Sequence, residues 1–301
     1  MSNDKVVTLT DGLEERLSVE ADLNPKVTIG MPAYNGAKTI EKAINSLLAQ
    51  TFKDFELIIS DDASDDETEN ICQRYALKDS RIIYVRQAQN LGELPNSKFL
   101  LDKAKGKYFM WAADDDWRSP EFLEVNVSAL DSNLKFVAST SPNCFEGEEN
   151  KYDKYVNFSL EGSPKERYVN FLQNAWHSHG IFYSLIRTEI IENYKNFVFS
   201  YAGCDWSFDL FLCSKGEINR AKEGLTIFGR FGLSMSKNPW KDLRNKPIEF
   251  FIPLYEFTKY ALVLMKNLKY NEWSHIFVKL LKVNIQAMRS NYQKTIKEFI
   301  K

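Results

Sequence analysis

The chain has 301 residues, of which 44% are hydrophobic and 27% charged, and its formal net charge is −2. Its length suits one large or two small globular domains, and its composition excludes collagen-like, mucin-like and wholly disordered classes. The four cysteines form no CxxC pair and no zinc-binding spacing, which favours a reducing, cytoplasmic setting. We also expect no signal peptide, because no basic segment followed by an apolar run opens the chain.

The charge is divided unevenly along the chain. Residues from Lys237 to the end carry 13 Lys or Arg and 5 Asp or Glu, a net charge of +8, so the preceding residues carry −10. This asymmetry predicts that the last part of the chain faces something anionic. The longest stretch without charged residues, Tyr168–Ile186, contains too many polar side chains to span a membrane.

Strands and helices alternate in the predicted elements. Residues Met1–Asn24 are mostly polar and predict a flexible lead or a short surface helix. Apolar runs predict buried strands at Val27–Met31, Phe55–Ser60, Arg81–Arg86 and Tyr108–Ala112. Helical spacing predicts helices at Ile40–Leu48, Glu67–Ala76, Ser97–Ala104 and Trp206–Cys213, with Ser64 or Asp65 as the N-cap of the second. The alternation predicts a parallel sheet covered by helices on both faces.

Acidic residues follow two of these strands, at Asp61–Asp66 and Asp114–Asp116. Ligands of parallel sheets bind beyond the carboxyl ends of the strands. Carboxylates repel a diphosphate, but they can hold one through Mg²⁺ or Mn²⁺. The alternative is a solvated loop before a helix that begins near Pro120. Neither a GxGxxG after a strand nor a GxxxxGK[ST] is present, which disfavours a dinucleotide oxidoreductase and a P-loop ATPase.

Five segments resemble, in order and spacing, the nucleotide-binding half of family 2 glycosyltransferases. They are Val27–Asn35, Ser46–Asp66, Asn90–Gly92, Ala104–Tyr108 and Asp114–Pro120. The resemblance runs from about residue 25 to 124 and more thinly to 238. It implies the GT-A fold, an α/β, Rossmann-like fold with a mostly parallel sheet flanked by helices, and inverting transfer from a nucleotide diphosphate sugar.

This resemblance divides the chain into four parts. Residues 1–24 are the lead, 25–125 the nucleotide-sugar-binding half and 126–236 the half with the acceptor site and the catalytic base. Residues 237–301 form a basic, aromatic-rich, helical C-terminal region.

The donor site that the resemblance implies lies at the strand ends. It comprises Pro32, Ala33, Tyr34, Asn35, Asp62, Lys98, Asp114 and Asp115. In this site Tyr34 packs on the base, and Asp62 accepts the base N–H, which favours uracil over purines. Asp114 holds the ribose or a metal-bound water, and Asp115 ligates Mn²⁺ or Mg²⁺.

Two departures from the family pattern affect this site. Ala113 stands where many relatives have the first Asp of an Asp-x-Asp-Asp motif. Asn96, Ser97 and Lys98 replace an Ala-Arg-Asn, so Lys98 is the expected substitute for the basic contact to the diphosphate or sugar. These departures motivate an alternative, a catalytically silent nucleotide-sugar-binding or scaffold protein of the same fold. A sugar nucleotidyltransferase is a further alternative, but the first loop lacks the glycine-rich sequence with Arg that it would need.

Inverting transfer also needs a general base for the acceptor hydroxyl. Asp205 takes the position of the base acid in relatives, although it would cap the helix Trp206–Cys213 in the simpler interpretation. The expected acceptor side comprises His177, His179, Trp206 and Asp209. If His177 and His179 lie on a strand, their rings share a face, and metal binding is an alternative to acceptor contact.

The C-terminal region predicts helices with two faces. Ile276, Leu280, Val283 and Ala287 share one face, flanked by Phe277, Leu281 and Met288, and the other side carries Lys279, Lys282, Gln286 and Arg289. Basic and aromatic residues together suit docking on anionic lipid, whereas packing on the core and self-association into a homo-oligomer are the alternatives.

The expected function is therefore transfer of a single sugar from a UDP-sugar to a cell-surface glycan, such as a lipid-linked oligosaccharide or lipopolysaccharide. The expected location is the cytoplasm, including the inner face of the membrane, and no nucleic-acid partner is expected.

Overall fold

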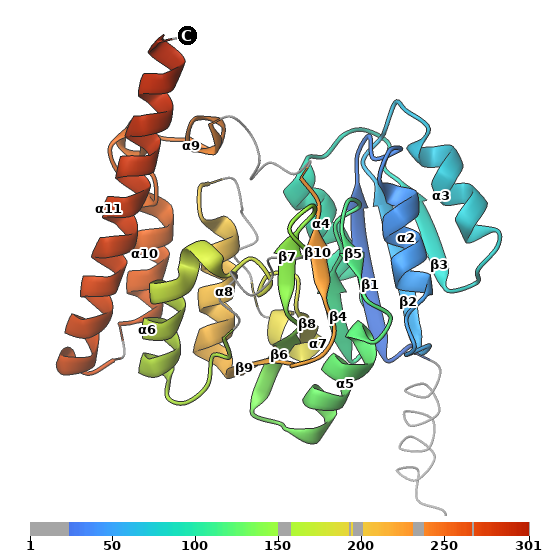
Figure 1. Cartoon of the computed structure of the whole chain (residues 1–301), viewed down its shortest axis with the longest axis horizontal. Coiled ribbons are helices and arrows are strands. Elements are labelled where there is room, and N and C mark those ends of the chain that lie inside the picture. Colours follow the sequence, from blue (N-terminus) through green and yellow to red (C-terminus); the bar gives the residue numbers. More distant parts are fainter. Residues whose placement is uncertain are drawn as a thin grey trace, which may run out of the picture.

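The chain folds around one large sheet with a small sheet beside it (Figure 1). A computed structural model describes residues 24–149, 158–192, 194, 201–230, 238–266 and 268–300. Apart from Asn24, the predicted N-terminal lead lies outside the described residues. The seven strands of the large sheet are β1 (Val27–Ala33), β2 (Phe55–Asp61), β3 (Ile82–Arg86), β4 (Tyr108–Trp111), β6 (Phe136–Thr140), β8 (Leu185–Arg187) and β9 (Glu217–Arg220).

The large sheet has the order β3-β2-β1-β4-β8-β6-β9. Strands β1 to β4 are parallel, as predicted, and β6 and β9 are parallel to each other. Strand β8 is antiparallel to both its neighbours, β4 and β6. The carboxyl ends of β1, β2 and β4 therefore open at one edge, where Ala33, Asp61 and the residues after Trp111 meet.

The small sheet brings a distant segment to the same edge. It consists of β5 (Trp117–Arg118), β10 (Thr226–Phe228) and β7 (Asn143–Phe145), in the order β5-β10-β7. Strand β10 is antiparallel to β5 and parallel to β7. Because β5 follows Asp116 directly, this pairing places the residues after β10 beside the acidic turn.

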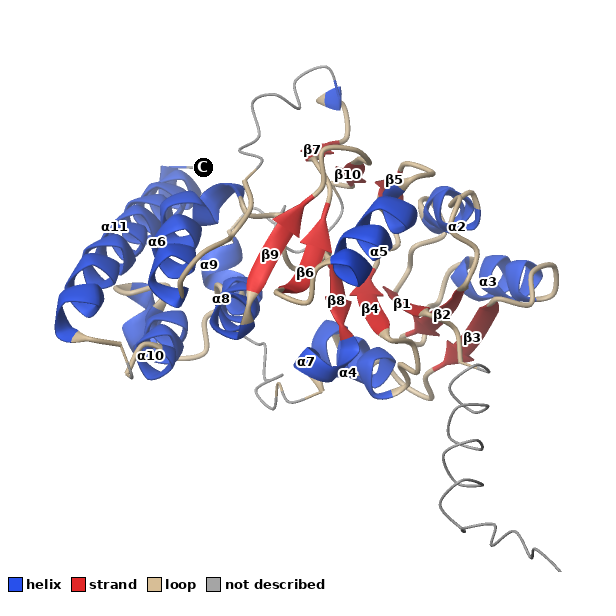
Figure 2. Cartoon of the chain, turned by 90° about the horizontal axis from the view of Figure 1, so that it is seen from below, coloured by secondary structure: helices blue, strands red, loops and turns tan. Residues whose placement is uncertain are grey.

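Helices cover both faces of the large sheet (Figure 2). Helices α2 (Ile40–Leu48), α3 (Thr68–Ala76) and α5 (Phe122–Ser132) lie on one face. Helices α4 (Glu93–Asp102) and α7 (Thr188–Ile191) lie on the other. The predicted apolar face of α2 is confirmed, since Ile40, Ala43, Ile44 and Leu47 are all buried.

Two predicted helix starts were wrong. Neither Ser64 nor Asp65 caps α3; its N-cap is Glu67, and the Thr68 N–H donates to the Asp66 carboxylate at 2.9 Å. Helix α4 begins four residues before the predicted Ser97. Its N-cap is Gly92, whose φ of 89° glycine adopts with little strain because it has no β-carbon.

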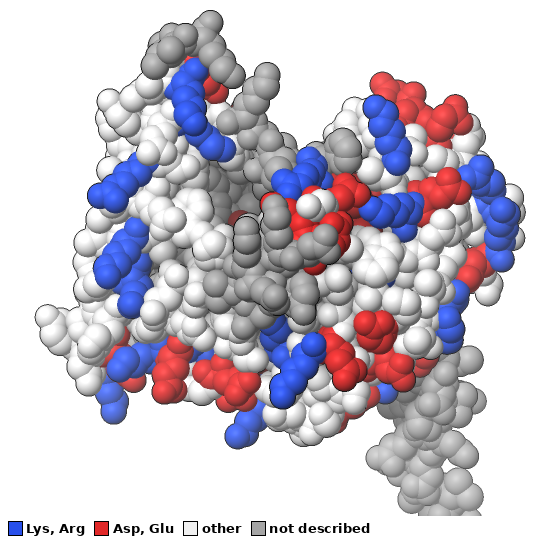
Figure 3. Space-filling view, in the orientation of Figure 1, with Lys and Arg blue, Asp and Glu red and all other residues white. Residues whose placement is uncertain are grey.

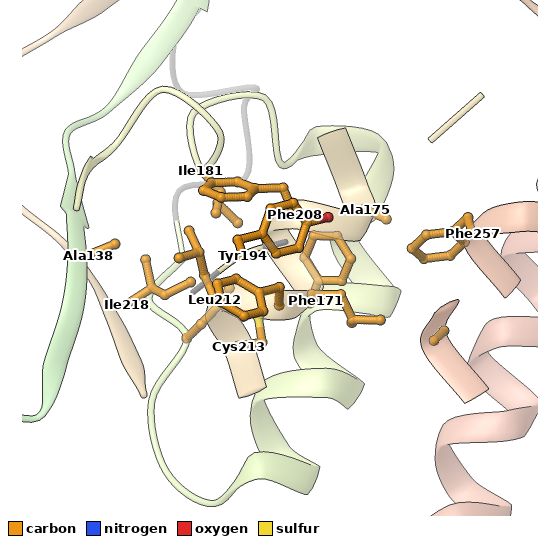
Figure 4. Close-up of a cluster of buried hydrophobic side chains, with 14 of the residues drawn as sticks. Ala138, Phe171, Ala175, Ile181, Tyr194, Phe208, Leu212, Cys213, Ile218 and Phe257 are labelled. Atoms are coloured by element: carbon orange, nitrogen blue, oxygen red, sulfur yellow. The ribbon is translucent and has the colours of Figure 1, made fainter. Parts of the chain in front are cut away.

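A second helical layer packs on the far side of β6 and β9. It contains α6 (Pro164–Asn174), η2 (Ala175–His177), α8 (Cys204–Lys215), α9 (Pro239–Asp242), η4 (Pro247–Phe250), α10 (Tyr255–Leu264) and α11 (Tyr270–Ile300). Phe208 and Leu212 of α8 lie between Phe171 of α6 and Ile218 of β9 (Figure 4). Phe257 of α10 belongs to the same core and lies on the side away from the sheet. The inner face of α11, with Ile276, Leu280, Val283 and Ala287, joins this core.

The cysteines and the helices bear on two further expectations. Cys72, Cys144, Cys204 and Cys213 are free thiols. No helix in the described part of the chain is long and apolar enough to cross a bilayer.

Candidate active site

Three consecutive carboxylates form an acid cluster (Asp114, Asp115 and Asp116) in the turn between β4 and β5. Asp114 and Asp115 are half-buried, and Asp116 is only 3% exposed. Figure 3 shows a hollow between the sheet and the helical layer, with acidic and basic side chains gathered at its rim over the small sheet. The acid cluster thus lies where a ligand of a parallel sheet is expected.

Two glycines lie directly against the first two carboxylates of the acid cluster, Asp114 and Asp115. A β-carbon built on Gly36 would lie 2.3 Å from Oδ2 of Asp114. One built on Gly229, directly after β10, would lie 2.1 Å from Oδ2 of Asp115. Real β-carbons do not come that close to other atoms, so a side chain at either position would displace its carboxylate.

The third carboxylate, Asp116, is held by Gly229 and Arg118. Asp116 accepts a hydrogen bond from the Gly229 N–H at 3.1 Å, and its Oδ2 lies 3.8 Å from Nη2 of Arg118. Arg118 is 1% exposed and donates to the Trp111 carbonyl at 3.3 Å. Oδ2 of Asp116 is buried without a hydrogen-bond partner, so this acid is a buried polar group whose bonding capacity is not used up.

Burial and mutual repulsion make the acid cluster reluctant to ionise fully. Burial raises the pKa of Asp114 to about 7, and the charges of Asp115 and Asp116 add to the effect. Burial likewise raises the pKa of Asp116 to about 7, against the opposing pull of Arg118. A bound cation would relieve this repulsion. No group of three His, Cys, Asp or Glu side chains arranged to hold a metal occurs among the described residues, so a cation here needs ligands from substrate or water as well.

The loops after β1 and β2 are tied to each other. Asn35 has a φ of 53°, in the left-handed region. Its side-chain oxygen accepts a hydrogen bond from the Asp65 N–H at 2.9 Å. Its own N–H donates to Ser64 Oγ at 2.9 Å. Asn35 therefore joins the loop after β1 to the loop after β2. Of its predicted neighbours, Ala33 is buried, Pro32 is half-buried and Tyr34 is 51% exposed.

Asp62 anchors the turn before α4. Its Oδ1 accepts from the Leu91 N–H at 2.7 Å and its Oδ2 from the Gly92 N–H at 2.9 Å. Each carboxylate oxygen keeps a second lone pair, so this geometry is compatible with the predicted bond from a base N–H. It also fixes where α4 begins.

Lys98 lies apart from the acid cluster. Its side chain is half-exposed and pairs with Asp102 one turn further along α4, at 2.6 Å. That pair points toward the C-terminal end of α4, whereas the acid cluster lies at the edge where α4 begins. Lys98 would have to leave this pair to contact a ligand there.

Asp205 belongs to the helical layer. It lies in the first turn of α8, and Gly203, with a φ of 83°, occupies the N-cap position in its place. The capping alternative for Asp205 is therefore wrong. Its side chain reaches solvent, yet the surrounding protein displaces enough water to raise the pKa of the carboxyl above its usual value.

The hydroxyl of Tyr183 is affected by the charges of both Asp205 and the acid cluster. Burial raises the pKa of its hydroxyl well above the usual value, and so do the charges of four carboxylates, Asp116, Glu93, Asp115 and Asp205. Glu93, in the first turn of α4, is exposed, yet the water displaced by the surrounding protein and the charge of Asp205 raise the pKa of its carboxyl. Acids from three distant parts of the sequence therefore affect the Tyr183 hydroxyl through their charges.

Sequence reasoning did not identify Tyr183, Glu93 or Gly229 as site residues. No local pattern marks them, because each reaches the site through tertiary pairing. The one available signal was the position of Glu93 directly after the Asn90–Gly92 turn, which the family resemblance had already placed at the site.

The expected acceptor residues occupy different environments. His177 ends the 3₁₀ helix η2 and His179 lies in the following turn, so the two residues do not lie on a strand. The ring of His179 packs edge-on against Phe145 at 5.1 Å. Trp206 is half-buried beside Trp176 at 5.1 Å, and Asp209 is 2% exposed in the core. Burial raises the pKa of Asp209 well above its usual value, and its side chain is internal.

Comparisons with known proteins agree with this fold. The family model described as Glycosyl transferase family 2 matches residues 28–195, more than half of the chain. The GalNAc(5)-diNAcBac-PP-undecaprenol beta-1,3-glucosyltransferase of Campylobacter jejuni is 32% identical over 174 residues. That alignment covers 56% of this chain and 54% of the relative, so the chain matches about half the length of that protein.

Solved structures share the fold at low sequence identity. TarS of S. aureus, residues 1–349, has a TM-score of 0.66 and 17% identity, covering 88% of this chain and 73% of that one. The mannosyltransferase PcManGT of Pyrobaculum calidifontis, solved with GDP-Man and Mn²⁺, has a TM-score of 0.56 and 14% identity, covering 91% and 75%. These likenesses confirm the predicted GT-A fold class.

Proposed function

Because the chain belongs to glycosyl transferase family 2, we propose that it transfers one sugar from a UDP-sugar to a hydroxyl of a growing cell-surface glycan, with inversion at the anomeric carbon. The observation that carries this proposal is the acid cluster beyond the carboxyl ends of the parallel strands, where Oδ2 of Asp116 is buried without a hydrogen-bond partner. A donor diphosphate at the strand ends and an acceptor hydroxyl beside Asp205 would lie on opposite sides of one sugar ring, as direct displacement requires.

The acid cluster fits a divalent cation, Mn²⁺ or Mg²⁺. Its carboxylates repel one another, and Asp114 and Asp115, beside Gly36 and Gly229, keep part of their surface exposed. Asp115 would ligate the cation, and Asp114 would hold the ribose or a metal-bound water. When bound, the cation neutralises charge on the leaving diphosphate. The neighbour PcManGT was solved with Mn²⁺, which supports this assignment.

The loops after β1 and β2 would hold the nucleoside. Tyr34 is exposed where it can pack on the base, with Pro32 and Ala33 beneath it. A free lone pair of Asp62 would accept the uracil N–H, while the amides of Leu91 and Gly92 hold its carboxylate in place. TarS was solved with UDP and with UDP-GlcNAc, which supports a uridine donor. Lys98 remains the proposed basic contact, provided that it exchanges Asp102 for the ligand.

Asp205 would act as the general base. A carboxyl with a raised pKa accepts a proton more readily in the transition state than an ordinary Asp, and the exposed side chain can reach an acceptor hydroxyl. His177, His179 and Trp206 would line the acceptor side, with Asp209 supporting them from the core. The relative from Campylobacter jejuni is named for a substrate linked to undecaprenol, so we propose a lipid-linked acceptor and work at the cytoplasmic face of the membrane.

The test is release of UDP from labelled UDP-sugars in the presence of Mn²⁺, repeated with a chelator. We expect turnover that the chelator abolishes and that Asp115→Ala removes together with Mn²⁺-dependent UDP binding. Asp65→Ala is the matched control, because this acid lies in the strand-end loop but outside the acid cluster. Tight UDP binding without turnover on any donor or acceptor would instead support the catalytically silent alternative.

A further inference from the structure

Helix α11 carries an apolar stripe on the side that faces away from the core. Its inner face is buried, since Ile276, Leu280, Val283 and Ala287 are at most 3% exposed. The outer side chains are instead 37% to 68% exposed; they are Phe277, Val278, Leu281, Ile285, Met288, Tyr292 and Ile296. Their spacing of three and four residues aligns them along one side of the helix. The predicted apolar face of α11 is thus buried, and only the residues that flank it are available to a partner.

The 3₁₀ helix η4 extends this outer stripe. Asn291 of α11 donates to the Phe250 carbonyl at 2.8 Å, which holds η4 and the residue after it along the edge of α11. Phe250 is 42% and Phe251 64% exposed, with their rings 5.1 Å apart. An apolar surface that continues over two elements marks an interaction site more often than scattered exposed residues do.

One border of the stripe is basic. Lys282 and Arg289 are exposed, each next to a stripe residue, and neither has an acidic partner within ion-pair distance in the described part of the chain. Figure 3 shows Lys and Arg side chains in a line over α11. The opposite border carries Asn284 and Asn291, which are buried against α10 and η4. The surface therefore offers aromatic and aliphatic groups bordered by unpaired cations.

This charge pattern distinguishes a lipid surface from a second copy of the chain. Two copies packed stripe to stripe would place no carboxylate opposite Lys282 or Arg289, because the borders of the stripe are basic on one side and carry buried amides on the other. Phosphates of anionic lipids would supply the missing negative charge. Helices with an apolar stripe, aromatic residues and a basic border are typical of those that lie in a membrane interface.

We propose that α11 and η4 dock on anionic lipid, with the apolar stripe entering the interface and Lys282 and Arg289 at the phosphates. This inference deepens the proposed function and rests on it, because a lipid-linked acceptor gives a reason for docking. The inner face of α11 stays on the core, so docking needs no rearrangement of the fold.

Co-sedimentation of the full chain with phosphatidylcholine vesicles, with and without phosphatidylglycerol, tests the proposal. We expect binding only with phosphatidylglycerol, weakened by salt. Lys282→Glu/Arg289→Glu should weaken it at least about tenfold, and Leu281→Gln/Met288→Gln should also reduce it. Lys78→Glu/Lys105→Glu is the matched control, because it changes the net charge equally at exposed lysines outside α11. Unchanged melting temperatures and UDP affinity would show that the variants fold.

Two outcomes would overturn the proposal. One is equal sedimentation with both vesicles, or none with either. The other is a dimer in light scattering that Leu281→Gln/Met288→Gln makes monomeric while vesicles fail to bind, which would assign the stripe to a second copy. Vesicle binding is measured without donor or acceptor, and UDP release is measured without vesicles. Failure of docking is therefore distinguishable from failure of the proposed function.

Discussion

Gly229 lies against Asp115, so closely that a β-carbon on the glycine would be 2.1 Å from Oδ2 of the carboxylate. The two residues are far apart in the sequence and meet because β10 pairs with β5. The same glycine donates its N–H to Asp116 at 3.1 Å. One residue without a side chain therefore positions two of the three carboxylates of the acid cluster.

Gly229→Ala should weaken Mn²⁺-dependent UDP binding by at least about tenfold, because the added methyl group must displace the Asp115 carboxylate and small displacements at such sites are costly. Titration calorimetry with UDP, with and without Mn²⁺, measures the effect. In the double variant Asp115→Ala/Gly229→Ala, UDP binding should equal that of Asp115→Ala alone. A further loss in the double variant would show that the glycine acts through another contact.

Asp114→Asn should stabilise the metal-free protein at neutral and alkaline pH. Asp114 has a pKa of about 7, above its value of 3.8 in the unfolded chain, so the folded state binds more protons and stability falls as pH rises between those values. Asn removes the repulsion, and we expect a gain of about 1–2 kcal/mol above pH 7 that disappears in acid. Urea unfolding with a chelator checks this, and UDP binding with Mn²⁺ should weaken at the same time. A loss of stability at every pH would contradict the assignment of repulsion.

Asp205→Asn should separate binding from transfer. The amide keeps the size of the side chain but cannot take a proton, so UDP affinity should survive while transfer falls by about a hundredfold or more. Paired measurements of UDP binding and of UDP release from the donor test this. Near-normal turnover would rule out Asp205 as the base.

Glu93→Gln should move the acid limb of the pH–rate profile to lower pH. The base must be ionised to act, so activity is lost as pH falls through the raised pKa of Asp205. The charge of Asp205 raises the pKa of Glu93, and this interaction is mutual, so removing the Glu93 charge should lower the pKa of the base. The plateau rate should change by no more than about threefold. Glu161→Gln, an exposed acid before α6, should leave the profile unchanged. An unshifted limb for Glu93→Gln would disprove the coupling.

The elements that sequence predicted well are those with strong local patterns. The apolar runs of β1 to β4 and the amphipathic spacing of α2 are properties of consecutive residues, and all were confirmed. Strands of two or three residues, such as β5, β8 and β10, depend on their partners for stability and carry too little pattern to predict. The predicted start of α4 was four residues late, and glycine at the N-cap and proline in the first turn are both compatible with the observed start.

The same limit applies to the site. Asp114, Asp115 and Asp205 could be named from motifs, because each lies in a recognisable segment. That the charges of Asp115 and Asp205 both raise the pKa of Tyr183 could not be predicted, because this depends on how the helical layer packs against the sheet.

The packing of α10 against the start of α8 sets a rule for recombining this chain with its relatives. A β-carbon on Gly203 would lie 2.8 Å from Leu254, and the rings of Trp206 and Phe257 are 6.0 Å apart. The segment that carries Asp205 is therefore shaped by helices that come after it in the chain. A chimera that exchanges only residues after 237 would pack side chains of another protein against the segment that carries Asp205, the proposed base. Crossovers made before residue 201 would transfer Asp205 together with the helices that pack against it. The segment to exchange between relatives is therefore larger than the C-terminal region.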